Sequence, residues 1–242
     1  MSPFFKKRTK SEQPTETVTI PDSEILKDKE GERVSSDLEE NIEGFNKIFK
    51  NDIDFLIRRF ALFGTQPAAL LCLKTLVGKE DIERDIVKPL QESNYPIDQS
   101  MNEIDYILNN VLYYSDVKTI TDSAELIQSL TLGKAVIFVD GIEKSLELDA
   151  KKPEKRAIEQ PETERVVRGA RDGFIEQIGT NVALLRYRLP VPEFRIESTE
   201  VGTRTRTKVV VCYMEDIVNE NLLVEVKKRI DAIKMDGILD AG

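Results

Sequence analysis

The spacing of hydrophobic residues predicts helices and strands along the first half of the chain. Apolar side chains at helical intervals over 38–49 predict an amphipathic helix, which the polar stretch 51–54 ends. Two apolar runs, 55–63 and 68–77, predict strands with a turn at 64–67. The same patterns predict three more helices, over 78–91, 101–113 and 124–132, and two more strands, over 117–120 and 135–139.

The second half of the chain continues this alternation. The pattern predicts a helix from about 173 to 188, strands over 194–202 and 205–214, and a helix over 219–233. The strand over 135–139 is wholly apolar, which is typical of a parallel or central strand that is buried on both faces. Strands and helices in both halves predict an α/β fold of two small lobes joined by a short linker.

Polarity divides the chain into an arm, two subdomains and a linker. Residues 1–36 hold seven cations, seven anions and few large apolar groups, so we expect a disordered or loosely ordered arm. We assign 37–150 to an N-terminal α/β subdomain and 165–242 to a C-terminal one. The polar, proline-bearing stretch 151–164 is the predicted linker.

Charge argues against some partners and leaves others open. The net charge is −9, which argues against a nucleic-acid partner because such binders are basic. Residues 151–210 nevertheless hold thirteen Lys or Arg against nine Asp or Glu. This basic stretch is either a solvated surface, a face that binds anions, or a surface attracted to the acidic remainder of the chain.

The residue types that most enzymes use are missing. The chain has no histidine, which removes Ser-His-Asp and Cys-His catalytic groups and the usual histidine zinc sites. The glycine loops that bind nucleotide phosphates are absent too. We therefore expect a binding or signalling protein that is not an enzyme and holds no metal or cofactor.

The two cysteines and the lengths of the apolar runs indicate in which kind of cellular environment the chain resides. Cys72 and Cys212 lie in apolar runs and are expected to be reduced and buried, with a disulfide between them as the less favoured alternative. No run approaches the ~20 apolar residues that cross a bilayer. The chain ends where a further helix would begin, so we expect it to be a piece of a longer protein.

One arginine-rich turn is the first candidate binding site. Arg168 and Arg171 flank Gly169, and Gly173 follows at the expected start of a helix. Helix N-termini attract anions, and arginine adds a fork that binds a carboxylate or phosphate through two hydrogen bonds. The alternative is that both arginines pair with neighbouring acids and brace the hinge between the lobes.

A second basic cluster follows in a predicted strand. Arg204, Arg206 and Lys208 alternate with threonines, so the period of a strand would place all three on one face. Such a row suits an acidic lipid, the acidic lobe or another subunit. It equally suits an edge strand that charges protect from aggregation.

Six ordered blocks of the chain together form a recognisable pattern: 139–141, 155–161, 165–174, 181–186, 201–209 and 236–240. These blocks resemble the A subunit of GerA-type spore germinant receptors. The resemblance extends over about 40–242, but Ala170 and Asp172 replace the usual Pro and Glu, and the linker lacks the usual tryptophan.

This resemblance implies a role in nutrient sensing. The A subunit would be a protein of the spore inner membrane, whose large soluble N-terminal region precedes transmembrane helices. Its partners would be a transporter-like B subunit and a lipoprotein C subunit, and the complex would sense amino acids or sugars and trigger ion release. The present chain would be the soluble region, on the core (cytoplasmic) side, with two lobes loosely like bilobed solute-binding proteins.

Two functions follow from the resemblance. The first is receptor assembly and signal transduction; the alternative is direct binding of a small nutrient in the cleft between the lobes. The residues expected to contact a ligand or partner are Arg168, Gly169, Arg171, Gly173, Asn181, Arg186, Arg204, Arg206 and Lys208.

Overall fold

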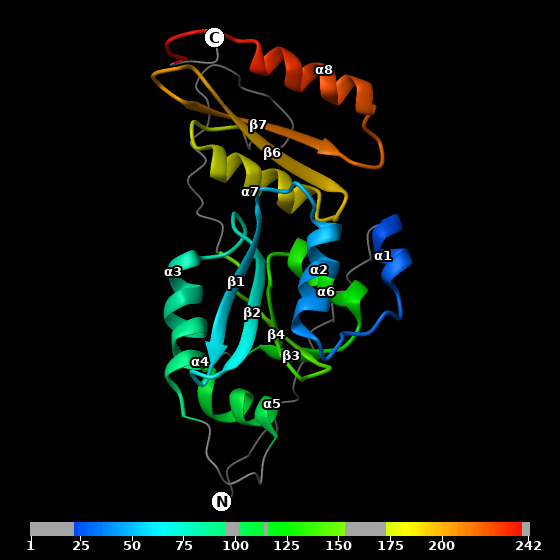
Figure 1. The fold of residues 1–242 in the computed structure, drawn as a ribbon, viewed down its shortest axis with the longest axis vertical. Coiled ribbons are helices and arrows are strands. Elements are labelled where there is room, and N and C mark those ends of the chain that lie inside the picture. The colour runs from blue at the N-terminus through cyan, green and yellow to red at the C-terminus, as the bar shows by residue number, and fades with distance from the viewer. Residues whose placement is uncertain (1–21, 95–101, 114–115, 153–172, 239–242) are drawn as a thin grey trace, which may run out of the picture.

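A five-stranded antiparallel sheet forms the centre of the first lobe (Figure 1). The computed structural model describes residues 22–94, 102–113, 116–152 and 173–238. Every strand pairing in the sheet is antiparallel, in the order β1-β2-β4-β5-β3. The strands are β1 (Phe55–Leu62), β2 (Gln66–Leu73), β3 (Val117–Ile120), β4 (Ala135–Val139) and β5 (Ser145–Leu148).

Helices cover both faces of this sheet and give the lobe two cores. The first face packs against α1 (Glu24–Lys29), α2 (Leu38–Ile48) and α6 (Ser123–Thr131). The second face packs against a pair of helices that each contain a π-helical turn. These helices are α3 (Lys79–Ile82) with η1 (Glu83–Val87) and α4 (Lys88–Glu92), and α5 (Glu103–Tyr106) with η2 (Ile107–Val111).

The sequence pattern predicted most of this lobe. All five residues of β4 are buried and the strand is central, as its apolar run predicted. β2 ends at Leu73 rather than near 77, and the helix that begins after Gly78 continues past Pro89 to Glu92. The short strand β5 was not predicted, because its Ser145 and Glu147 are polar residues that are nevertheless buried.

Residues 22–36 are ordered, which corrects the expectation of an arm over 1–36 for this part of it. Ser23 caps α1, and Leu26 and Val34 are buried in the core that α2 and α6 share. The Val34 amide donates to the carbonyl of Thr121 at 3.0 Å. Two apolar side chains and these backbone contacts are enough to fix a segment whose composition is otherwise polar. Residues 1–21 lie outside the described part of the chain.

Asp122 fixes the start of α6 and holds the preceding segment to it. One carboxylate oxygen accepts from the Glu125 amide at 3.0 Å, and the other accepts from the Gly31 amide at 2.9 Å. We expect Asp122→Ala to lower the free energy of unfolding by about 1–2 kcal/mol, measured by urea denaturation, because it removes this cap. Asp122→Asn keeps an acceptor oxygen and should lose less; equal losses in both variants would contradict the capping role.

The second lobe is a β-hairpin between two helices (Figure 1). Its elements are α7 (Ile178–Arg188), β6 (Phe194–Val201), β7 (Thr207–Met214) and α8 (Glu220–Asp231). β6 and β7 pair antiparallel over their full length, from Phe194 opposite Met214 to Val201 opposite Thr207. With a sheet and helices in each lobe, the predicted mixed α/β fold class is confirmed. Most of the predicted linker, 153–164, lies outside the described residues.

Candidate functional site

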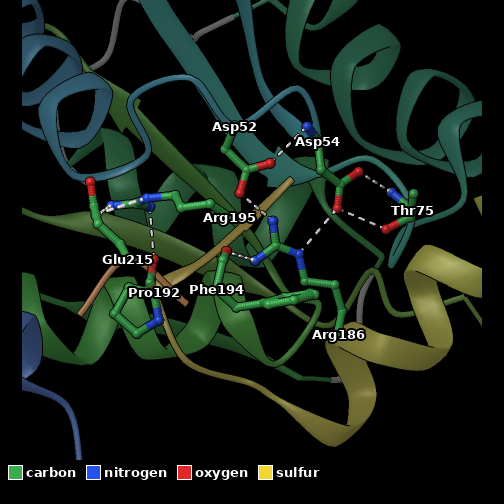
Figure 2. Close-up of polar contacts among 8 residues, drawn as sticks. All are labelled: Asp52, Asp54, Thr75, Arg186, Pro192, Phe194, Arg195 and Glu215. Atoms are coloured by element: carbon green, nitrogen blue, oxygen red, sulfur yellow. Dashed lines mark hydrogen bonds and ion pairs between the residues drawn. The ribbon is translucent and has the colours of Figure 1, made fainter. Parts of the chain in front are cut away.

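A buried arginine joins the two lobes (Figure 2). Arg186 lies near the C-terminal end of α7, and its side chain is 0% exposed. The guanidinium donates through one terminal nitrogen to the Asp52 carboxylate and through the other to the Phe194 carbonyl at 2.7 Å. Its Nε lies 3.5 Å from an oxygen of Asp54. A single side chain of the second lobe thus contacts two acids of the first.

The two acids lie in the loop that connects α2 to β1. Asn51 adopts a left-handed conformation with φ 63°, which turns the chain out of the helix and toward the strand. Asp54 is oriented by Thr75, whose amide and hydroxyl donate to its carboxylate at 2.9 and 2.7 Å. Asp52 accepts from the Asp54 amide at 2.9 Å. Both carboxylates are therefore positioned by their own lobe before Arg186 is added.

The electrostatics of this cluster depend on burial. Two carboxylates face one guanidinium, and all three side chains are shielded from water. Burial raises the pKa of Asp52, against the opposing attraction of the Arg186 guanidinium. Removing the cation from such a pair is costly because it leaves a buried charge without a partner.

A second arginine secures the turn that faces Arg186. Arg195, also buried, donates to the Pro192 carbonyl at 2.7 Å and through Nε to the Glu215 carboxylate at 2.9 Å (Figure 2). Next along the strand, the Ile196 carbonyl accepts from the Ile53 amide of the first lobe at 2.9 Å. The start of β6 is therefore held both by its own lobe and by the loop that carries Asp52.

Helix α7 is apolar on two sides because it packs between the lobes. Val182 belongs to the core of the second lobe, together with Phe194 and Ile196. Ala183 and Tyr187 pack instead against the first lobe. Burying apolar surface on both sides of one helix makes the junction resemble a continuous core. We call the contact region of Asp52, Asp54, Arg186 and the start of β6 the lobe junction.

The arginine-rich turn cannot be placed. Arg168, Gly169 and Arg171 lie outside the described residues, so their predicted role stays a prediction. The helix expected to start at Gly173 begins five residues later, at Ile178. Gly173 is therefore not at a helix N-terminus, and the reason for placing an anion beside it is removed.

Asn181 and Arg186 make contacts within the chain. The Asn181 side chain accepts from the Ile175 amide at 2.8 Å and donates to the Ile175 carbonyl at 2.6 Å, which closes the loop before α7. Arg186, expected to contact a ligand or partner, is used entirely at the lobe junction. Both side chains therefore hold parts of the fold together, and their expected contact with a ligand or partner stays a prediction.

The predicted basic row on one strand face was wrong. Arg204 and Arg206 lie in the turn between β6 and β7, and only Lys208 lies in the strand. Gly202 and Arg206 have φ of 90° and 47°, so the chain reverses there and the strand period does not apply. The arginines are 83% and 75% exposed, and they contact Asp236 at 4.0 Å and Glu200 at 2.7 Å.

The cysteines differ from each other in burial. Both are free, and Cys72 is buried as expected, which raises the pKa of its thiol to about 12. Cys212, on β7, is only half-buried. A thiol with so high a pKa as that of Cys72 stays protonated and unreactive near neutral pH.

Sequence reasoning did not identify the acids of the junction. Asp52 and Asp54 lie in the polar stretch that was expected only to end a helix. A local signal did exist for the acids: Asp52-Ile53-Asp54 places two charged residues around an apolar one directly before a strand. Their partner is 134 residues away from Asp52, and no pattern in a single sequence shows that pairing.

Known proteins match this chain in both sequence and fold. The family model for the Bacillus/Clostridium GerA spore germination protein matches residues 43–242. The crystal structure of the N-terminal domain of the A subunit of the Bacillus megaterium spore germinant receptor GerK3 is similar, with a TM-score of 0.67 and 25% identity. It covers 84% of this chain and 74% of that one. By fold, the chain is similar to the N-terminal domain of a germinant receptor A subunit. It belongs to the GerA family of spore germination proteins.

Relatives in Bacillus subtilis (strain 168) match nearly the whole chain. Spore germination protein KA is 29% identical over 99% of this chain and 45% of its own length. The uncharacterized membrane protein YfkQ is 30% identical over 90% of this chain and 42% of its own length. The chain thus spans less than half the length of these two relatives. Within the described residues, no helix has the length and apolar character needed to cross a membrane.

Proposed function

We propose that this domain acts, without catalysis, in the assembly and signal transduction of a germinant receptor. The lobe junction is the observation that supports this role. Buried ion-pair contacts and a helix packed on both lobes would make a change in one lobe felt in the other. Binding of a nutrient elsewhere in the receptor would then bias a gate through the packing of lobes or subunits.

The proposed setting follows from the family. The two relatives from Bacillus subtilis are about twice as long as this chain, and one of them is named as a membrane protein. We propose that the domain lies on the core side of the spore inner membrane and works with receptor B and C subunits. Ion release and germination would be the output of that complex.

The turn between β6 and β7 is the proposed contact to a partner. Arg204 and Arg206 project from it, and each has one exposed acidic neighbour that water screens. Neither arginine is needed for the fold, because exposed ion pairs contribute little to stability. A carboxylate on another subunit that binds either guanidinium by two hydrogen bonds would bury and strengthen such a pair.

This proposal predicts that Arg204→Ala with Arg206→Ala slows germination while sparing the fold. In spores that carry the full-length protein, we expect the rate to fall roughly tenfold, which corresponds to about 1.4 kcal/mol of lost contact. The isolated domain should keep its unfolding free energy within about 0.5 kcal/mol. Germination is followed by the loss of optical density after nutrient is added.

The matched control is Arg229→Ala. Arg229 is an exposed arginine of α8 whose guanidinium pairs with Glu225 on the same helix. It should leave germination unchanged. Normal germination in the double variant, at a normal receptor level measured by immunoblot, would remove the turn from the proposed role.

Titration separates signal transduction from direct nutrient binding. The isolated domain is titrated with a panel of amino acids and sugars and followed by calorimetry and NMR shifts. The proposal expects no saturable response, since the lobes meet through Arg186, Asp52 and Asp54 at the junction. A specific and saturable response would support the alternative, a nutrient site between the lobes.

A further inference from the structure

Residues 22–36, which we call the strap, are fixed to the first lobe along most of their length. Leu26 and Val34 are buried in its core. The Glu32 carbonyl accepts from the Ser123 amide and the Ser36 carbonyl accepts from the Gly141 amide, both at 2.8 Å. Contacts at the start of α6 and just after the end of β4 hold the strap as an added layer of this lobe.

The N-terminal end of the strap is held by the second lobe instead. Glu193, which directly precedes β6, accepts from the Ser23 hydroxyl at 2.5 Å and from the Ile25 amide at 3.1 Å. Its side chain carries a charge, yet the residue is only 4% exposed. Figure 1 shows α1 beside α6, near the point where β6 begins. The strap therefore bridges the lobes.

This attachment stabilises a charge that would otherwise be costly to bury. The Ser23 hydroxyl also accepts from the Leu26 amide at 3.1 Å, so the serine caps the helix and at the same time donates a hydrogen bond to Glu193. Amides at the start of a helix favour an anion beside them. If the strap moved away, Glu193 would lose its partners and would have to be exposed to water.

One turn carries two of the connections between the lobes. Glu193 binds the strap, and the carbonyl of the next residue, Phe194, accepts from Arg186 at the lobe junction. The Glu193 carbonyl itself accepts from the Glu215 amide at 2.9 Å, which ties the turn to the end of β7. A shift of this turn that broke the contact between Glu193 and the strap would therefore also displace the Phe194 carbonyl that accepts from Arg186.

We propose that the strap is a conformational lock: its attachment at Glu193 holds the two lobes in their present relative position. The lock rests on the proposed signalling role, because it gives that role a segment whose release would loosen the lobe junction. With the strap attached, the turn and Arg186 are held together. With the strap released, the second lobe keeps the lobe junction and the packing of Ala183 and Tyr187 on the first lobe, and the population of open junctions rises.

Hydrogen exchange on the 242-residue chain tests the lock. In Glu193→Ala, amides of α1 and of α7 should exchange roughly tenfold faster. The loss of hydrogen bonds to a charged group makes local opening more favourable by about that factor. The amides of β4 should keep their slow exchange, since this strand lies in the core of the first lobe. Glu193→Gln keeps an acceptor oxygen and should give a smaller change in the same two helices.

A matched variant separates the lock from a general loss of stability. Glu197 lies on β6 and binds Tyr213 and Lys227, both within the second lobe. Glu197→Ala should loosen α8 and leave α1 unchanged. Ser23→Ala removes the same contact from the strap side, and it should speed exchange in α7, which Ser23 does not touch.

Each other outcome would overturn the lock. Faster exchange confined to α1 would show that Glu193 only caps a helix. Faster exchange in β4 to the same degree would show loss of the whole fold, and unchanged α7 in both Glu193 variants would show that the lobes do not depend on the strap. These measurements involve no membrane or partner, so a negative result leaves the receptor role standing, and normal germination in the arginine variants leaves the lock standing.

Discussion

Replacing Arg186 by methionine is expected to lower the free energy of unfolding by about 3–5 kcal/mol. Methionine fills much of the same space, so the loss comes from charge and hydrogen bonding. Asp52 and Asp54 would remain buried without a cation, and the Phe194 carbonyl would lose its donor. Urea denaturation followed by far-UV circular dichroism measures the change, since the chain has no tryptophan to report by fluorescence.

Two variants show whether burial causes this effect. Arg204→Met makes the same substitution at an arginine that is 83% exposed, and it should change stability by less than about 0.5 kcal/mol. In the Asp52→Asn background, Arg186→Met should lower the free energy of unfolding by less than in the parent. One of the two buried carboxylates that would be left without a cation is already absent. A loss below about 1 kcal/mol for Arg186→Met alone would contradict a buried ion-pair junction.

The substitution Phe138→Ala should lower the unfolding free energy by a similar amount, about 3–5 kcal/mol. Phe138 lies on the central strand β4, is almost fully buried and packs its ring 5.3 Å from that of Phe45 on α2. Removing it opens a cavity between the sheet and α2 that rigid neighbours cannot close. The same denaturation experiment measures it.

The size of the missing side chain should set the loss. Phe138→Leu keeps most of the volume and should cost roughly 1.5 kcal/mol or less. Tyr113→Ala removes another aromatic ring, but one that is 96% exposed, and it should be nearly neutral. Similar losses in Phe138→Ala and Tyr113→Ala would show that the core between β4 and α2 is not closely packed.

The elements that were predicted well are those whose periodicity is set by burial. β4 has the predicted ends because a central strand must be apolar on both faces. The helix α2 and the hairpin strands β6 and β7 were also predicted within a few residues. In each case one local pattern decides both the structure and the buried side.

β5 shows where this logic fails. Its Glu147 is buried because Lys134 donates to it at 2.7 Å and Ser129 donates from α6. Its Ser145 donates to the Ile137 carbonyl of β4 at 3.0 Å. A polar residue with partners can lie in a core, but only the folded chain supplies those partners.

The strand face predicted for Arg204 and Arg206 was wrong, and the burial of Arg186 was not predicted, for different reasons. The strand period was applied to Arg204 and Arg206, yet a left-handed residue at Arg206 reverses the chain before β7 begins. Arg186 was picked out for its charge, and its burial could not be foreseen because Asp52 is distant in sequence. Local backbone geometry explains the first case, and a pairing between residues distant in sequence explains the second.

The separation between Asp52 and Arg186 also sets an order of events during synthesis. A ribosome adds about 5–20 residues per second, so the 134 residues between the two take on the order of ten seconds to make. Throughout that interval both acids exist without their cation, and Ser23 exists without Glu193. The nascent first lobe must therefore remain soluble while its acidic loop is exposed to water. The surface that contacts the second lobe is covered only when the last third of the chain has emerged.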